Sequence, residues 1–215
     1  MNTALRLPTA GIVLASQSPR RLQLLQQMAL PVVAMPVDID ETPYRQEAPA
    51  TYVARMSDSK CAAARPLVAP WLTDGDSEPR LLLAADTIVV SGGQILGKPR
   101  DVPAAKAMLT QLSDAEHQVM TSVTIASAHA LRSAVSVATV RFRALTPADI
   151  DAYVATGEGL DKAGSYGIQG IGGIFAEHIS GSYSAVVGLP IATVETLLTD
   201  MGIDTWRLRT NIDDV

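Results

Sequence analysis

One acidic side chain stands in the middle of an otherwise apolar segment of the sequence. Asp86 lies within the run from Leu82 to Val90, in which Thr87 is the one other polar residue. Burying a carboxylate costs on the order of several kcal/mol unless it is paired, hydrogen-bonded or metal-bound. A structural aspartate with satisfied hydrogen bonds is the alternative. We favour a functional group that holds a divalent cation or accepts a proton from water, because perturbed carboxylates gather at active sites.

A second candidate is a turn with the sequence SQSPRR, which begins at Ser16. Ser18 suits the N-cap of a following helix, and Pro19 suits its first position. A helix N-terminus offers unpaired N–H groups and partial positive charge, and here two hydroxyl groups and the side chains of Arg20 and Arg21 stand at the same end. The combination predicts a phosphate site. An ordinary N-cap with two solvated arginines is the alternative.

Lysine is scarce in this chain, with four residues against thirteen arginines. Lys98 ends a GxxxxGK segment, but Pro99 stands where a P-loop needs Ser or Thr, so we reject the P-loop interpretation. Lys60 and Lys162 also lie in or beside polar motifs. Compact positive charges placed in this way indicate a shared anion, and we therefore interpret all three lysines as phosphate-binding candidates.

The glycine-rich segment from 161 to 170 contains Lys162 and Gln169. Glycine lets the backbone approach a ligand closely, and an amide side chain can both donate and accept hydrogen bonds. Gln169 could therefore read the edge of a base. A structural loop with exposed polar residues is the alternative, and spacing alone does not distinguish the two.

A divalent cation fits the acidic members of this set. Glu41 lies in an acidic turn, and Asp86 is the carboxylate described above. Hard cations such as Mg²⁺ and Mn²⁺ prefer carboxylate oxygens and carry phosphate charge. We therefore expect Glu41 and Asp86 to bind the metal, with a triphosphate as its partner.

The elements that must position these residues alternate between strands and helices, which predicts an α/β fold with a mixed sheet. The turn at 91–94 reads as a hairpin, and the glycine-rich stretch 157–173 reads as an active-site loop. The residue pattern predicts strands at 11–15, 32–37, 81–90 and within 118–128 and 134–144; helices at about 19–28, 50–64 ending before Pro66, 102–112, 147–155 and 190–201; and an exposed loop at 73–79.

Composition narrows the class of protein. The formal net charge of −5 argues against a nucleic-acid-binding surface, because phosphate backbones are held by clustered Lys and Arg. A single cysteine excludes an internal disulfide, and the three histidines lack metal-ligand spacing. The sequence contains neither a signal-peptide pattern nor an apolar run of 18 residues. We expect a cytoplasmic protein that contacts neither membrane nor nucleic acid.

Taken together, the motifs resemble the Maf family of nucleoside triphosphate pyrophosphatases over roughly residues 11–201. The resemblance implies an ITPase-like α/β fold, in which a mixed, partly elongated sheet is flanked by helices and two lobes enclose a substrate cleft. We expect one domain over 1–215, with a polar tail at about 203–215 outside the motifs. The matching segments are LASQSPRR at 14–21, DIDETP at 38–43, AADTIVV at 84–90, LGKPRD at 96–101, DKAGSYGIQG at 161–170 and VVGLP at 186–190.

The resemblance also implies an activity, which is hydrolysis of a nucleoside triphosphate to the monophosphate and pyrophosphate with Mg²⁺, Mn²⁺ or Co²⁺. Asp86 matches the family's proton acceptor. The Asp86-Thr87 pair and the GIQG run resemble the subgroup that acts on dTTP and UTP. The family associates the positions of Arg20, Thr87 and Gln169 with substrate choice, and it places around the phosphates or metal the positions of Ser16, Arg20, Glu41, Lys60, Lys98 and Lys162.

Two alternatives remain open at this point. The enzyme could act chiefly on modified or damaged pyrimidine nucleotides, with dTTP turnover secondary. The chain could instead be a nucleotide-sensing regulator of cell division that acts through protein partners and binds nucleotide without turnover. The preferred metal and the oligomeric state, a homodimer included, are also left open by the sequence.

Overall fold

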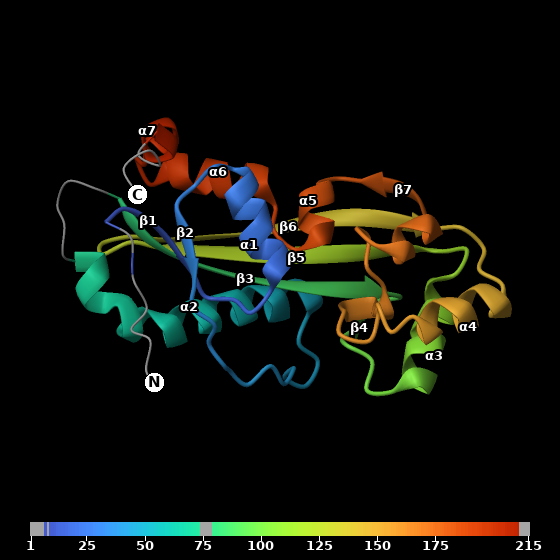
Figure 1. The fold of residues 1–215 in the computed structure, drawn as a ribbon. Helices are drawn as coiled ribbons and strands as arrows, with labels where there is room; N and C mark the ends of the chain where they lie inside the picture. The colour runs from blue at the N-terminus through green and yellow to red at the C-terminus, as the bar shows by residue number, and fades with distance from the viewer. Residues whose placement is uncertain (1–6, 8, 74–78, 211–215) are drawn as a thin grey trace, which may run out of the picture.

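A seven-stranded sheet forms the centre of the protein (Figure 1). The computed structural model describes residue 7 and residues 9–73 and 79–210. In chain order the elements are β1 (Gly11–Leu14), α1 (Pro19–Gln27), β2 (Val32–Ala34), α2 (Pro49–Thr73), β3 (Arg80–Ser91), β4 (Gln94–Leu96), α3 (Val102–Leu112), β5 (Glu116–Ala126), β6 (Leu131–Phe142), α4 (Pro147–Ala155), η1 (Ala163–Ser165), η2 (Ile171–Phe175), β7 (Ala176–Ser180), α5 (Tyr183–Val187), α6 (Ile191–Asp200) and α7 (Thr205–Thr210).

The sheet is mixed, as the sequence predicted. Its strand order is β2-β1-β3-β5-β6-β7, and β4 pairs separately with β3. The β2, β1 and β3 strands are parallel, whereas β3, β5, β6 and β7 are antiparallel neighbours. With 12 residues in β3, the long strands extend about 40 Å at roughly 3.3 Å per residue. The sheet is therefore elongated, and its two ends carry different helices.

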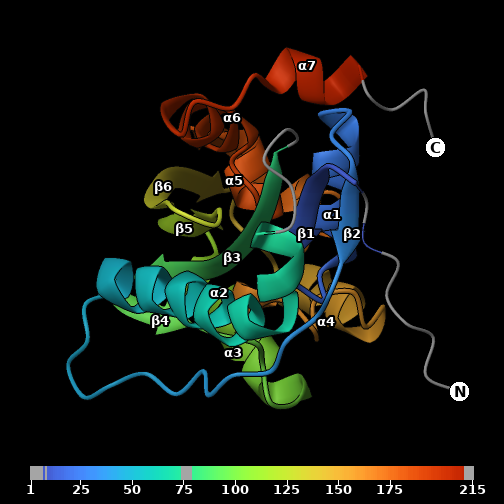
Figure 2. The ribbon, with the colours of Figure 1, turned by 90° about the vertical axis from the view of Figure 1, so that its left-hand side faces the viewer.

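Of the four apolar clusters in the described chain, two lie under α2, and the other two lie at opposite ends of the sheet and give the molecule two lobes. In the first lobe α1 and α6 pack on β1 and the start of β3, with Leu14, Leu25 and Leu83 fully buried. In the second lobe α3 and α4 pack around Phe142 and Phe175 at the far end. Figure 1 shows α2 along one face of the sheet, and Figure 2 shows α1 and α6 on the opposite face. The predicted two-lobed α/β architecture is confirmed.

Local sequence signals account for most of these elements. Gly92 and Gly93, with φ of 57° and 76°, form the two-residue turn between β3 and β4, which confirms the predicted hairpin. Asp101 caps α3 by accepting a hydrogen bond from the backbone of Ala104 at 2.7 Å. The α3 and α4 helices have the predicted bounds. No helix in the described ranges combines the length and apolarity needed to cross a membrane.

The predicted end of the second helix before Pro66 is wrong. α2 continues to Thr73 with Pro66 and Pro70 inside it. Both prolines are exposed, whereas Ala64 and Val68 are buried against the sheet. Carbonyl groups that lose a partner at these prolines therefore face water, and packing of the opposite face overrides the local preference against proline.

The C-terminal part of the chain holds more structure than the sequence predicted. A strand, β7, and a short helix, α5, follow the glycine-rich loop, and both are too brief for a clear periodic signal. In the predicted tail, α7 packs through the buried side chain of Leu208. Arg209 adds an ion pair with Glu195 at 2.6 Å. Residues 211–215 of that tail and 74–78 of the predicted loop lie outside the described residues.

Candidate active site

The middle of β3 has no neighbouring strand among the described residues on one of its two edges, and a large cavity lies at this open edge. β1 pairs with β3 as far as Leu14 opposite Leu83, and β4 begins to pair only at Val89 opposite Leu96. Between these two points no strand of the described chain covers that edge of β3. The cavity above it has a volume of about 1180 Å³.

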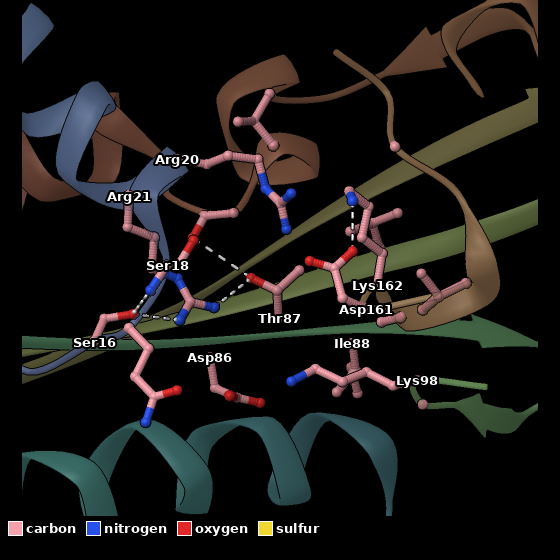
Figure 3. Close-up of a pocket in the computed structure, with 18 of the residues that line it drawn as sticks. Ser16, Ser18, Arg20, Arg21, Asp86, Thr87, Ile88, Lys98, Asp161 and Lys162 are labelled. Atoms are coloured by element: carbon pink, nitrogen blue, oxygen red, sulfur yellow. Dashed lines mark hydrogen bonds and ion pairs between the residues drawn. The ribbon is translucent and has the colours of Figure 1, made fainter. Parts of the chain in front are cut away.

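Every site residue predicted from the sequence lines this one cavity. Figure 3 shows Arg20 and Arg21 entering from α1, with Lys162 and Asp161 facing them from the glycine-rich loop. Residues separated by more than 150 positions in the chain therefore meet at a single place. The predicted set is Ser16, Ser18, Arg20, Arg21, Glu41, Lys60, Asp86, Thr87, Lys98, Lys162 and Gln169.

Strand alternation sends neighbouring residues of β3 to opposite faces of the sheet. Asp86 points toward α2, where it meets Lys60, and Thr87 points toward α1, where it meets Arg21. The absence of a covering strand lets the cavity reach both faces. A carboxylate from one face and a cation from the other are thus available to the same ligand.

Lys60 holds the two acidic candidates together. Its Nζ lies 2.6 Å from Oδ1 of Asp86 and 2.7 Å from Oε1 of Glu41. Burial alone would raise the pKa of Glu41, but the hydrogen bond and charge of Lys60 outweigh it and hold that pKa below its ordinary value. Lys60 leaves the second oxygen of each carboxylate available to another partner.

Tyr52 was not predicted as a site residue, yet it fixes the acidic turn. Its hydroxyl donates a 2.8 Å hydrogen bond to the backbone carbonyl of Glu41. Burial, reinforced by the charges of Asp86 and Glu41, raises the pKa of Tyr52 to about 12. The phenol therefore stays a donor at neutral pH. Its sequence signal, an aromatic residue 11 positions after Glu41 in α2, is too weak to find it.

The two adjacent arginines of the turn have different surroundings. Arg21 is buried, and it donates to the Gly188 carbonyl at 2.9 Å, to Ser16 Oγ at 3.1 Å and to Thr87 Oγ1 at 3.1 Å. Burial lowers its pKa, although the nearby Asp86 charge opposes the shift. Arg20 is half-buried and makes no hydrogen bond or ion pair in the described part of the chain. Arg20 therefore offers its guanidinium to a ligand more freely than Arg21 does.

The hydroxyl groups of Ser16 and Ser18 in the turn also have different hydrogen-bond partners. Ser18 occupies the predicted N-cap position of α1, but its side chain makes no capping hydrogen bond. Ser16 Oγ instead accepts from the Ser18 backbone at 3.1 Å and from Arg21. Ser18 is therefore the N-cap by position, as predicted, but its hydroxyl lines the cavity without a partner from the described chain.

The Thr87 hydroxyl is already hydrogen-bonded to other side chains of the protein. Its Oγ1 accepts from Arg21 and lies 3.0 Å from Oγ1 of Thr121, which donates to the Ala185 carbonyl at 2.8 Å. Because the Thr121 proton is used in that bond, Thr87 supplies the proton between the two threonines. The Thr87 hydroxyl is thus engaged on both sides, and its effect on a ligand would pass through Arg21.

The opposite wall of the cavity is the glycine-rich loop. Lys162 donates to the carboxylate of Asp161 and to the backbone carbonyl of Glu158. Gln169 and Lys98 are exposed in the cavity and make no hydrogen bond or ion pair within the described ranges. Asp161 and Glu158 line the cavity but were not predicted as site residues, because acidic residues in a glycine-rich segment carry no specific spacing signal.

The fold and the cavity together define an α/β protein with a cleft at an open sheet edge that is lined by both basic and acidic side chains. The basic side chains suit a phosphorylated ligand. The chain belongs to the Maf family, whose model, described as Maf-like protein, matches residues 11–201.

Curated relatives match nearly the whole chain. It is 48% identical to the dTTP/UTP pyrophosphatase of Alcanivorax borkumensis, over 92% of this chain and 98% of that one. It is 47% identical to the dTTP/UTP pyrophosphatase of Pseudoalteromonas atlantica, over 89% and 97% of the two chains. Among solved structures, the Staphylococcus aureus Ham1 protein is similar with a TM-score of 0.40 and 12% identity, over 61% of this chain and 71% of that one.

Proposed function

We propose that this protein hydrolyses dTTP and UTP to the nucleoside monophosphate and pyrophosphate. The observation that carries the proposal is the pairing of an Asp86 carboxylate, held at one oxygen by Lys60, with cations on both walls of the same cavity. Relatives that share nearly half of its residues over about 90% of the chain are named for this activity. The cytoplasm, where nucleoside triphosphates are available, is the compartment that fits it.

The triphosphate would lie between the two walls. Arg20 and the first N–H groups of α1 face it from one side, and Lys162 faces it from the other, with Lys98 at the β4 end of the gap. Arg21 would act on the triphosphate mainly through its positive charge, because three of its N–H groups already donate hydrogen bonds to the protein. Most of the rate would come from this positioning and charge neutralisation.

The proposed activity includes a divalent cation, and the residues present fit one. Glu41 and Asp86 converge on one lysine nitrogen, so a hard cation between them finds two carboxylates. No group of three or more His, Cys, Asp or Glu residues suited to a metal occurs in the described ranges, so phosphate oxygens would complete the set. When bound, the cation neutralises phosphate charge.

Asp86 supplies the base for the hydrolytic step. The oxygen of a water molecule forms a bond to the α-phosphorus while its proton passes to the Asp86 carboxylate. The bond between the α-phosphorus and the bridging oxygen breaks, and pyrophosphate leaves with its charge balanced by the lysines. Lys60 fixes the orientation of the carboxylate through its 2.6 Å contact with Oδ1.

Gln169 is the group that we propose reads the base. Thymine and uracil present the same alternating acceptor, donor and acceptor edge, which an amide can match. Gln169→Glu removes the amide donor and adds charge, so we expect the relative kcat/KM values of dTTP, UTP and dCTP to change by about tenfold, as lost polar contacts to a substrate do. An unchanged substrate profile would remove Gln169 from base recognition.

The decisive experiment measures pyrophosphate release from normal and modified nucleoside triphosphates with Mg²⁺, Mn²⁺ and Co²⁺. The proposal expects highest kcat/KM for dTTP and UTP. Faster hydrolysis of a modified pyrimidine nucleotide would make that nucleotide the main substrate and dTTP a secondary one. Tight nucleotide binding without turnover by the folded protein would instead support a sensing role and overturn the proposal.

A further inference from the structure

The glycine-rich wall is held by one carboxylate that the proposed reaction does not use. Oε2 of Glu158 accepts a 2.9 Å hydrogen bond from the backbone of Ile171, and Oε1 accepts a 3.0 Å bond from the backbone of Gly172. The Tyr153 hydroxyl also donates to Oε1 at 3.0 Å and accepts from the backbone of Gly167 at 3.1 Å. Three of these bonds thus connect α4 and Glu158 to both ends of the segment that carries Gln169, and the fourth joins Tyr153 to Glu158.

The glycines of this segment leave room for that carboxylate and for nothing larger. A Cβ at Gly170 would lie 2.4 Å from Oε2 of Glu158, and a Cβ at Gly172 would lie 2.8 Å from the Tyr153 hydroxyl oxygen. Real Cβ atoms do not approach other atoms so closely. The loop therefore closes around the Glu158 carboxylate at Gly170 and around the Tyr153 hydroxyl at Gly172.

The same residue also holds the loop's lysine. The backbone carbonyl of Glu158 accepts from Nζ of Lys162, whose other partner is Asp161. One residue consequently fixes a phosphate-facing cation through its main chain and a base-facing amide, Gln169, through its side chain. No other residue of the described chain bonds to both parts of this wall.

We propose that Glu158 is a positioning residue that sets the distance between the phosphate-binding and base-reading parts of the site. The inference rests on the proposed function, because it assigns those two tasks to Lys162 and Gln169. Glu158 acts through the loop and does not contact the reacting atoms.

The chemistry at this position requires an acceptor at both oxygens. Three donors converge on the Glu158 carboxylate, two from the backbone and one from Tyr153. A glutamine of the same shape has one acceptor and one NH₂ group. Whichever way its amide turns, an NH₂ group would face a backbone N–H, so Glu158→Gln should loosen the loop without adding volume.

The test measures Glu158→Gln in three ways. We expect faster hydrogen exchange at the amides of Ile171 and Gly172, a rise of about tenfold in KM for dTTP, and a fall of about tenfold in the preference for dTTP over dCTP. The value of kcat should change less than threefold, because Asp86 and Lys60 are untouched. Unchanged exchange, or unchanged preference with a loosened loop, would overturn the proposal.

Asp149→Asn is the matched control. Asp149 lies nine residues earlier and also accepts several hydrogen bonds, from Thr146 and Arg143, but it does not line the cavity. This variant should lose stability without altering KM or nucleotide preference, which separates a positioning role from general destabilisation. Wild-type protein that releases no pyrophosphate would overturn the proposed function instead, and the exchange rates would still decide whether Glu158 anchors the loop.

Discussion

The two walls of the cavity are built in different ways. The wall at Ser16–Arg21 is a strand end followed by a helix start, and its helix packs on an apolar core through Leu24 and Leu25. The wall at 157–173 contains only short 3₁₀ turns and is held by hydrogen bonds to Glu158 and Tyr153. Regular structure positions the first wall, whereas the irregular second wall depends on these polar contacts together with an apolar anchor, Tyr166, which packs against Phe142.

This difference predicts where each wall is sensitive. A wall that is fixed by a helix and an apolar core tolerates the loss of a surface group, because the backbone stays in place. A wall that is fixed by a few hydrogen bonds moves when one acceptor is lost, because each buried polar group left without a partner costs about 1–3 kcal/mol. The following predictions test that distinction.

The strand between the walls should show the largest effect. Asp86→Asn removes the proposed base while leaving both walls intact, so kcat should fall by roughly 10² to 10⁴-fold, equivalent to about 3–5 kcal/mol. Pyrophosphate release under saturating dTTP measures it. Asp114→Asn, at an exposed residue whose partner is Arg141, is the control and should retain full activity. Near-normal turnover by folded Asp86→Asn protein would contradict the role of Asp86.

The second wall should be the acid-sensitive one. His117 is buried beneath it, with Nε2 2.9 Å from the Tyr166 hydroxyl and Nδ1 without a partner among the described residues. Burial lowers the pKa of His117 from 6.5 to about 4. Between pH 4 and 6.5 the His117 imidazole is protonated in the unfolded chain but neutral in the folded protein. The free energy of unfolding is therefore highest above pH 6.5 and falls by about 3 kcal/mol as the pH drops to 4.

Urea unfolding across this pH range tests the assignment to His117. His117→Gln should flatten the loss of unfolding free energy between pH 6.5 and 4, because the variant has no imidazole to protonate. His178→Gln removes an exposed histidine and serves as the control, for which we expect the wild-type pH profile. Equal profiles for wild type and His117→Gln would assign the acid sensitivity to other groups.

Within the first wall, the adjacent arginines should separate stability from binding. Arg21→Met removes three hydrogen bonds, to Ser16, Thr87 and Gly188, so unfolding free energy should fall by about 2 kcal/mol. Arg20→Met should change it by less than about 0.5 kcal/mol and raise KM for dTTP instead, because Arg20 makes no hydrogen bond or ion pair with any described residue. Urea unfolding and KM measurements on both variants check this, and equal losses of stability would contradict the division.

The first wall could be predicted from the sequence, and much of the second could not. The apolar strand, the N-cap serine and Pro19 are local signals, so the positions of β1 and α1 follow from a few neighbouring residues. One contact of the first wall was also beyond prediction, because the hydrogen bond from Arg21 to the Gly188 carbonyl joins residues 167 positions apart and no local pattern encodes it.

Glu158 illustrates the same limit in the loop. The three hydrogen bonds of its carboxylate reach residues 5 to 14 positions away through an irregular backbone. Hydrophobic periodicity describes helices and strands but is silent about such a segment. The glycines in the sequence predicted a loop. Only the structure shows that the Glu158 carboxylate lies in the space that a Cβ of Gly170 would need.

Two helix starts of the same design allow the smallest effect to be measured. α1 and α4 both have nine residues and begin with proline, after Ser18 and Thr146 respectively. Thr146 Oγ1 accepts from the Asp149 backbone at 3.1 Å in a capping box, whereas the Ser18 hydroxyl caps nothing. Thr146→Ala should therefore cost about 1 kcal/mol of stability and leave KM unchanged.

Ser18→Ala should do the reverse. We expect a stability change of only a few tenths of a kcal/mol and a rise in KM for dTTP of roughly fivefold, the value of one hydrogen bond of about 1 kcal/mol to the substrate. Thermal unfolding and KM measurements on both variants give the comparison. A loss of stability in Ser18→Ala equal to that in Thr146→Ala would make Ser18 an ordinary cap. A rise in KM with little loss of stability in Ser18→Ala would mean that the Ser18 hydroxyl is free to bind the ligand, because Ser16 Oγ already accepts the hydrogen bond that holds the turn.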